Sequence, residues 1–441
     1  MDTNRKVSAL KRGCCVAGLL STLVLPTLVQ AEEGAFTSKS KARYVQLMEV
    51  TPDLLPQIKG LSFQDLSLQA IDASGNLSPI PFQFDEYNKF GIHHVKGSGL
   101  DTVGEEGIFD ENDELVFMYR DAGDKASKEK LSSIEGKVVA ELSIDDDGQL
   151  RYAYVLKGNA ARSNKDYADY DEKTHLFTTD TWSMQTDPEN VLKWTDHFIK
   201  TFDGGKTTFA DSMKVRVLAK VGFFNVTLDN DNVIGKVLAV KDGPVRDILA
   251  ISASVVVLRI PFLTLDVGLE LSESSLVLPI SATVPSVAKA IKAPVLTATL
   301  DFANVSGALV RSGLSSKEPS VVDNKMSSEE KKFSLNEQEP WLALSTDKGY
   351  EGFLMIRSDD ASLKKGLSLT AIYKEGTKPD KPERFPGSEP ELGFNITDMP
   401  PGDTVNYVIT LFHVDKFWYD NTPEVFIHSL MEQPPVTATS L

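Results

Sequence analysis

Apolar and polar residues alternate along several segments of the chain. Every second residue of 263–271 is apolar, and the residues between are mostly polar. The same alternation runs through 213–221, where basic residues occupy several of the polar positions. Successive side chains of a strand point to opposite faces, so this pattern predicts half-buried strands.

Other segments extend the β-rich pattern. The apolar run 248–258 is rich in valine and isoleucine, which predicts a strand buried on both faces. Turn-forming Asp, Asn and Gly residues punctuate the chain at 72–76, 145–148, 203–205 and 242–244. One short helix is expected within 281–291, with Pro285 near its start. Many short strands and few helices predict an all-β protein built from sandwich-like domains.

The length of 441 residues is too great for one ordinary core, and 41% hydrophobic residues is typical of folded proteins. We expect an N-terminal β-sandwich domain over 32–165, a connecting segment over 166–199 and a larger, supersandwich-like β-sandwich domain over 200–441. A closed outer-membrane barrel is the competing architecture. The patchy alternation and the frequent acidic turns argue against it.

Residues 1–31 have the features of a secretory signal peptide. Four basic residues near the start precede the uncharged, mostly apolar run 14–29, and small residues precede Glu32. A membrane anchor is the alternative, but this run is shorter than the roughly 20 residues that span a bilayer. Cleavage after Ala31 would make the protein periplasmic or secreted in a bacterium, with no membrane span left. It would also remove Cys14 and Cys15, the two cysteines of the chain.

The balance of acidic and basic residues limits the classes of ligand that the protein is expected to bind. The chain has 46 Lys and Arg against 63 Asp and Glu, a formal net charge of −17. This balance argues against nucleic acid and anionic lipid as ligands, because like charges repel. A mature chain without cysteine also excludes thiolate chemistry. We expect no required cofactor.

The acidic turn 109–117 is a candidate calcium site. Asp110, Asn112 and Glu114 alternate, so an extended backbone places them on one side, and calcium prefers oxygen ligands. The alternative, which the turn chemistry favours, is a structural turn with solvated side chains.

Segments 80–86 and 107–117 together resemble an acidic turn of β-sandwich modules in some secreted bacterial proteins. Segment 242–246, which reads Asp-Gly-Pro-Val-Arg, resembles a turn of the β-supersandwiches in aldose epimerases and polysaccharide lyases. The resemblance implies a protein that binds or processes saccharides and singles out no specific family. No catalytic residue of those groups has a counterpart here. Asp85, Glu86 and Asp110 are the carboxylates to inspect first for catalysis.

No catalytic motif stands out among the remaining residues. His93 and His94 are adjacent and would face opposite sides of a strand, so a structural or surface role is favoured for them. Aromatic residues with polar neighbours suit sugar rings, whose apolar faces stack while their hydroxyls need partners. The ligand-binding candidates of this kind are Trp341, Tyr350, His413, Trp418 and Tyr419. Their alternative is a place in the core.

These observations favour an exported binding or accessory protein, with a saccharide or another envelope component as its ligand. The missing motifs argue against an enzyme. A carbohydrate-active enzyme of the lyase, epimerase or glycosidase type is the first alternative. A structural or assembly factor of the envelope is the second.

Overall fold

The structure is a computed structural model that describes residues 38–313, 319–334, 340–376, 390–414 and 423–441. Every described residue belongs to one compact unit, Phe36–Leu441. The expected signal peptide and both cysteines therefore lie outside the described residues. Across the described ranges, no helix has the length and apolar character needed to cross a membrane.

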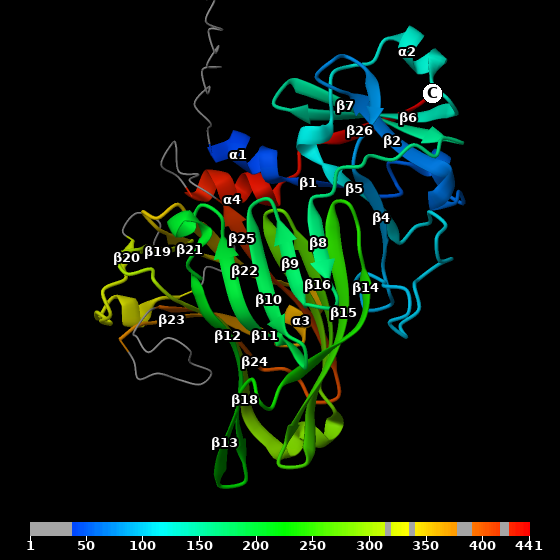
Figure 1. Cartoon of the computed structure of the whole chain (residues 1–441). Coiled ribbons are helices and arrows are strands. Elements are labelled where there is room, and N and C mark those ends of the chain that lie inside the picture. The colour runs from blue at the N-terminus through cyan, green and yellow to red at the C-terminus, as the bar shows by residue number, and fades with distance from the viewer. Residues whose placement is uncertain (1–37, 314–318, 335–339, 377–389, 415–422) are drawn as a thin grey trace, which may run out of the picture. The chain divides into compact units, whose positions relative to one another are not determined.

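Two antiparallel sheets are built mainly from residues 47–157 (Figure 1). The smaller has the order β1 (Leu47–Val50), β5 (Asp113–Met118) and β4 (Phe82–Glu86). The larger has the order β26 (Val436–Ser440), β6 (Lys137–Asp146), β7 (Gln149–Lys157), β2 (Leu66–Ile71) and β3 (Leu77–Pro79). Buried side chains of both sheets share one core, in which the rings of Phe84 and Phe109 meet edge to face.

Three further sheets enclose the largest core of the protein. One has the order β13 (Phe224–Leu228), β12 (Ala210–Val221), β18 (Ile291–Phe302), β24 (Glu391–Thr397) and β23 (Ser368–Lys374). The longest has the order β14 (Ile234–Lys241), β15 (Arg246–Val257), β16 (Ile260–Ser272), β17 (Ser275–Thr283), β25 (Thr404–Val414), β22 (Glu351–Ser358), β21 (Trp341–Ser345), β19 (Leu309–Ser312) and β20 (Ser320–Val321). The third has the order β11 (Asn190–Ile199), β10 (Trp182–Asp187), β9 (Leu176–Thr179) and β8 (Ala168–Asp171).

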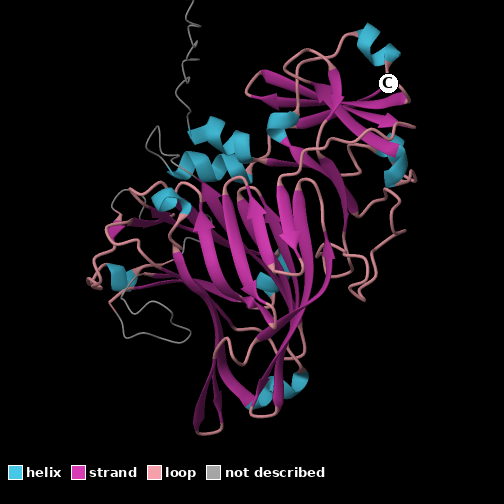
Figure 2. Cartoon of the chain, viewed as in Figure 1, coloured by secondary structure: helices cyan, strands magenta, loops and turns pink. Residues whose placement is uncertain are grey.

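The described helices are short (Figure 2). The α-helices are α1 (Ser38–Val45), α2 (Lys128–Ser133), α3 (Asp360–Lys364) and α4 (Pro423–Met431), and α1 packs on α4. The 3₁₀ turns are η1 (Pro56–Ile58), η2 (Phe63–Asp65), η3 (Tyr119–Asp121), η4 (Phe202–Gly205), η5 (Ser286–Ala290) and η6 (Glu330–Lys332). The all-β prediction is confirmed, and the helix expected within 281–291 is the 3₁₀ turn η5, which begins after Pro285.

The expected strands form, but their polar faces are more covered than alternation predicts. In β16 the apolar positions are buried as expected, and Glu270 and Ser272 on the other face are buried as well. In β12 the basic residues Lys214 and Arg216 are buried and pair with Asp301 and Glu391. Buried charges of this kind need partners, which the chain supplies from distant strands.

Candidate functional site

Arg246 lies at the centre of a buried ionic cluster between the three-stranded sheet and strands β15 and β16. Its side chain is 3% exposed and faces carboxylates from β1, β4, β5 and β16. Nε donates to Asp85 Oδ2 at 2.9 Å, and Nη1 donates to Glu49 Oε1 at 3.0 Å. Nη2 pairs with Glu114, and Nη1 lies 3.6 Å from Glu270 Oε2. One guanidinium, with its five donors, thus joins four strands that are far apart in sequence.

Asp85 is fully buried and is held ionised by its surroundings. Lys241 Nζ lies 2.8 Å from Oδ1, and Gln83 Nε2 donates to both carboxylate oxygens at 2.8 and 3.1 Å. Burial acts to raise the pKa of Asp85, but Lys241 and Arg246 outweigh it and hold that pKa well below its usual range. Asp85 therefore contributes a permanent negative charge to the cluster.

His93 joins the cluster from the loop after β4. Its Nδ1 lies 2.6 Å from Glu270 Oε1, and its Nε2 lies 3.0 Å from Glu114 Oε1. Burial lowers the pKa of His93 and Arg246 opposes its protonation, but the two carboxylates outweigh both and raise that pKa to about 10. The Tyr87 ring packs against the imidazole, with centroids 4.4 Å apart. His93 is thus a further cation of the cluster at neutral pH, beside Arg246 and Lys241.

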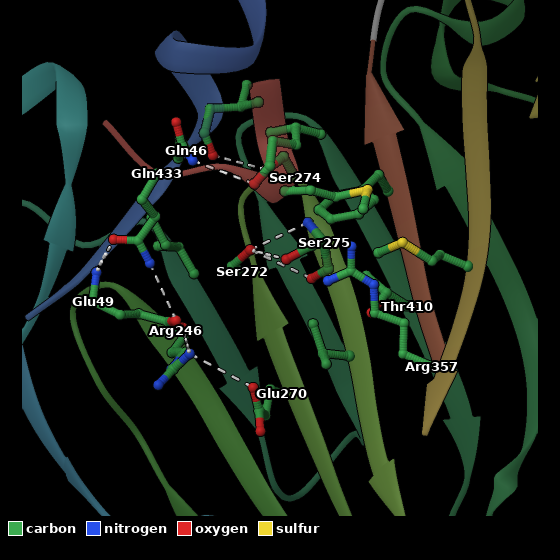
Figure 3. A pocket seen from close by; sticks show the side chains of 17 residues that line it. Gln46, Glu49, Arg246, Glu270, Ser272, Ser274, Ser275, Arg357, Thr410 and Gln433 are labelled. Carbon is green, nitrogen blue, oxygen red and sulfur yellow. Dashed lines mark hydrogen bonds and ion pairs between the residues drawn. The ribbon is translucent and has the colours of Figure 1, made fainter. Parts of the chain in front are cut away.

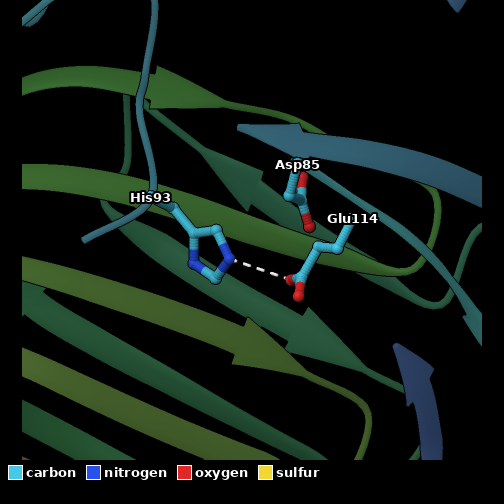
Figure 4. A group of neighbouring side chains, drawn as sticks. All are labelled: Asp85, His93 and Glu114. Carbon is cyan, nitrogen blue, oxygen red and sulfur yellow. Dashed lines mark hydrogen bonds and ion pairs between the residues drawn. The ribbon is translucent and has the colours of Figure 1, made fainter. Parts of the chain in front are cut away.

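Asp85, His93 and Glu114 are also the ligand types that a divalent cation uses (Figure 4). Each offers one ligand atom, and these atoms lie within 4.8 Å of one another. Arg246, however, contacts all three side chains. The guanidinium therefore takes the place that a metal ion would need, so we interpret the group as an ionic cluster.

The three sequence segments singled out by resemblance meet at this cluster. Segment 80–86 supplies Asp85, segment 107–117 supplies Glu114, and segment 242–246 supplies Arg246. Gly243 allows segments 80–86 and 242–246 to approach closely, because a Cβ at residue 243 would lie 2.4 Å from Gln83 Oε1. That oxygen accepts the backbone N–H of Arg246 at 3.0 Å, which fixes the start of β15.

A pocket of about 240 Å³ opens beside the cluster, among β1, β16, β17, β25 and α4 (Figure 3). Glu49, Arg246 and Glu270 belong both to the cluster and to its wall. Hydroxyl and amide side chains line it further, namely Gln46, Ser272, Ser274, Ser275, Thr410 and Gln433. Its apolar lining includes Val277, Met355, Phe412, Leu430 and Met431.

Arg357 lines the pocket from β22 and differs from Arg246 in its surroundings. Within the described ranges, no carboxylate lies within ion-pair distance of the Arg357 guanidinium. Arg357 is an exposed residue. Partial burial lowers its pKa, without a contribution from any carboxylate. Arg357 therefore offers the pocket a guanidinium whose donors are open to a ligand.

The carboxylates of the expected sites have separate roles. Asp110 Oδ1 accepts the backbone N–H of Asn112 at 3.0 Å, and Oδ2 accepts that of Glu105 at 3.0 Å, so this carboxylate closes the turn. Glu114 faces Arg246 instead. Glu86 accepts the Gly107 N–H at 3.0 Å and lines a different depression from that beside Arg246. Calcium at Asp110, Asn112 and Glu114 stays a prediction.

The aromatic candidates that the structure describes do not line the pocket beside Arg246. Trp341, Tyr350 and His413 are each fully buried, and Trp418 and Tyr419 lie outside the described residues. The His413 ring packs against Trp182, with centroids 4.6 Å apart. The three buried side chains therefore fit the alternative interpretation, in which these aromatic residues belong to the core.

Sequence reasoning missed Glu49, Glu270 and Arg357 as members of the site. Glu270 stands at a polar position of an alternating strand, where a charged residue indicates solvent, and Arg357 follows a continuous apolar run in β22. His93 carried a weak signal, since a histidine in a chain with only six invites inspection. Only the tertiary fold brings these residues together.

Comparisons with known proteins identify no family. No family model and no curated protein matches the chain. An α-mannosidase from Enterococcus faecalis V583 matches over 90% of this chain and 44% of its own, with 13% identity and a TM-score of 0.46. A protein in the glycosyl hydrolase family 38 from Enterococcus faecalis matches over 90% of this chain and 45% of its own, with 11% identity and a TM-score of 0.41. Heparan sulfate lyase HepC from Pedobacter heparinus matches over 61% of this chain and 38% of its own, with 12% identity and a TM-score of 0.34. The chain spans less than half the length of each, and these likenesses to saccharide-processing proteins are weak.

Proposed function

We propose that this chain is an exported protein that binds a saccharide in the pocket beside Arg246. The observation that supports this function is the lining of the pocket. Two carboxylates, two guanidinium groups and several hydroxyls line it together with Phe412. Sugar hydroxyls bind to such acceptors and donors, while the apolar face of a sugar ring packs on an aromatic ring. Export rests on the features of residues 1–31.

The ionic cluster supports binding because it holds polar groups of the pocket in fixed positions. Arg246 and Glu270 are tied to His93, Asp85 and Glu114 on the side away from the pocket. Groups that are already ordered lose little conformational freedom when a ligand arrives. The volume of about 240 Å³ lies below the usual range of pockets for drug-sized ligands. We therefore expect one terminal sugar residue to enter.

The test is a calorimetric titration of the chain with neutral, acidic and amino monosaccharides and disaccharides. We expect at least one of them to bind, and Phe412→Ala and Arg357→Met each to weaken that binding by roughly tenfold. Phe90→Ala, whose ring lies outside the pocket, is the matched control and should bind as the wild type does. No binding in the panel, or binding that both pocket variants leave intact, would contradict the proposal.

A carbohydrate-active enzyme is the second candidate, and the carboxylates of the pocket favour it. Glu49 and Glu270 lie 3.0 and 3.6 Å from the same nitrogen of Arg246. Burial and the neighbouring Glu114 raise the pKa of Glu49, although its side chain is 38% exposed. Glycosidases use a pair of carboxyl groups, of which one has a raised pKa and acts as the acid.

Glu49→Gln separates the two functions. An enzyme would turn over a bound saccharide, and this variant would keep its affinity and lose turnover. A binding protein would give no product with either chain, as measured by chromatography of the saccharide after prolonged incubation.

A further inference from the structure

The end of strands β12, β15, β16 and β18 away from the pocket carries three loops, which we call the sandwich tip (Figure 1). They are the β12–β13 hairpin with its flanks, 218–225, the β15–β16 hairpin, 255–262, and the segment around η5, 285–293. The pocket lies at the other end of the same strands, since β16 begins in the tip and ends at Ser272 in the pocket wall.

The sandwich tip exposes large apolar side chains. Phe223 is 98% exposed and Phe224 is 72% exposed, both at the end of the β12–β13 hairpin. Leu258 and Val287 add exposures of 57% and 54% from the other two loops. Single exposed apolar residues are ordinary on a protein surface, but a group of this size at the ends of loops is typical of an interaction site.

The three loops are neighbours in space. Lys220 and Lys292 are partners in the ladder between β12 and β18, and the next pair toward the end is Val221 and Ile291. The 3₁₀ turn η5 in turn contacts β16, which begins just after Leu258. The exposed side chains therefore belong to one end of strands β12, β15, β16 and β18.

The β15–β16 turn is strained and exposes both of its side chains. Val257 and Ile260 are ladder partners, so Leu258 and Arg259 form a two-residue loop. Both have positive φ, 48° and 72°, a conformation for which such turns favour Asn-Gly. Leucine and arginine are strained there. The turn presents these two side chains, one apolar and one cationic, at the outermost point of the hairpin.

The charge of the sandwich tip is opposite to that of the whole chain. Its three segments contain Lys220, Arg259, Lys289 and Lys292 and no Asp or Glu, whereas the chain as a whole has 63 acidic and 46 basic residues. All four cations are exposed. In the part of the chain that the structure describes, no carboxylate lies within ion-pair distance of any of them.

We propose that the sandwich tip binds the surface of a lipid bilayer that contains anionic headgroups. Phe223, Phe224 and Leu258 enter the boundary of the acyl chains, and the four cations contact headgroup phosphates. The net charge of −17 does not prevent this, because charges farther away than the Debye length, about 8 Å at physiological ionic strength, are largely screened. This inference is independent of the saccharide pocket.

The test uses chain from residue 32 onward and vesicles of phosphatidylglycerol and phosphatidylethanolamine, with phosphatidylcholine vesicles for comparison. We expect co-sedimentation with the anionic vesicles, weakened by 0.5 M salt. The double variant Phe223→Ser, Phe224→Ser should lower the partition coefficient by roughly tenfold or more. Lys289→Glu with Lys292→Glu should also lower it, and only for the anionic vesicles.

Matched controls lie elsewhere on the surface. Leu150→Ser replaces an apolar side chain that is 48% exposed, and Lys173→Glu with Lys206→Glu reverses two exposed cations, so both should bind as the wild type does. Phe223→Trp supplies a second readout, a blue shift of tryptophan emission with anionic vesicles. Equal binding by all variants, or no blue shift, would overturn the proposal. The proposal would also fail if vesicles bound no form of the chain and the double variant differed from the wild type only by losing self-association, as measured by sedimentation velocity.

Discussion

His93 and His197 are both buried, but their surroundings are opposite in kind. His93 lies between the carboxylates of Glu114 and Glu270, at 3.0 and 2.6 Å. His197 lies among aromatic rings, with centroids 5.2 Å from that of Trp182 and 4.5 Å from that of Phe209. Burial lowers the pKa of His197 to about 3, whereas in His93 the carboxylates outweigh burial and raise the pKa to about 10.

The aromatic surroundings hold a second histidine of the same kind. The rings of His197 and His413 have centroids 4.7 Å apart, and no ring nitrogen of either has a hydrogen-bond partner in the described residues. Burial lowers the pKa of His413, and the neighbouring His197 adds to this effect. Both rings are therefore neutral and pack as flat, weakly polar rings.

The contrast between the two histidines shows how this chain buries polar groups. Where the three-stranded sheet meets β15 and β16, charges of both signs come together, and each ionised group has a partner. In the aromatic cluster the imidazoles stay neutral, and the unmade hydrogen bonds are the cost of packing. Burial alone thus does not set the charge of a histidine. The groups within hydrogen-bond reach do.

The strongest test of the comparison removes the guanidinium of Arg246. Arg246→Met would remove one counter-charge from each of the buried carboxylates Asp85, Glu114 and Glu270. Breaking a buried ion pair from one side costs roughly 3–5 kcal/mol, so we expect a loss of this size in the free energy of unfolding. The measurement is urea unfolding followed by fluorescence at pH 7.

Arg357→Met is the matched control, because Arg357 is exposed and has no ion pair with a described residue. Its substitution should change stability by no more than about 0.5 kcal/mol. Similar losses in the two variants would mean that the cluster contributes nothing beyond an ordinary surface arginine.

The second test exchanges each histidine for a neutral residue. His93→Gln removes two charge-assisted hydrogen bonds to carboxylates, and we expect a loss of about 2–3 kcal/mol. His197→Phe breaks no hydrogen bond to a described partner and replaces one flat ring by another, so its effect should stay within about 1 kcal/mol. Urea unfolding of both variants at pH 7 measures the contrast. A larger loss in His197→Phe would reveal a polar partner of that ring.

The third test uses pH, because the two pKa shifts have opposite signs. The folded-state pKa of His93 is raised, so its contribution is fully present below about pH 6.5 and is lost as the pH rises toward 10. The penalty of His93→Gln should shrink over that interval. The pKa of His197 is lowered, so the wild type should lose stability relative to His197→Phe as the pH falls from 6.5 toward 3. Unfolding free energies at half-unit pH steps check both slopes, and parallel curves would contradict the assignment.

Much of the fold is predictable from local pattern. The alternation in 263–271 and 213–221 falls within β16 and β12, and η5 lies within 281–291. The run 248–258 is buried on both faces only in its first half, because Ser254 and Val256 of β15 are exposed near the sandwich tip. Side-chain period is a local property, whereas the cover over the second face depends on which sheet packs there.

The candidate site is less predictable, because it is made of distant segments. Segments 80–86, 107–117 and 242–246 each stand out in the sequence, but nothing local indicates that Asp85, Glu114 and Arg246 share one cluster. Glu270 is an example. It stands on the polar side of an alternating strand, which predicts contact with solvent, but it is buried in the fold. Local patterns identify unusual segments, and only long-range pairing shows which charges neutralise each other.

Asp113 is a carboxylate of β5 whose neighbours include no ion-pair partner in the described residues. It is 3% exposed, its Oδ2 accepts the backbone N–H of Asp110 at 2.6 Å, and its Oδ1 is buried without a described partner. Burial, with Asp110 and Glu86 adding to it, raises its pKa to about 7. A raised carboxyl pKa means that the folded state holds the proton more tightly, so stability is lost as the pH rises from about 4 through 7. Asp113→Asn removes that charge and should be more stable than the wild type at pH 8, with no difference at pH 4. Asp124→Asn, an exposed carboxylate, should match the wild type at both values in the same urea titration. A destabilised Asp113→Asn at pH 8 would show instead that this carboxylate is paired, as Asp85 is.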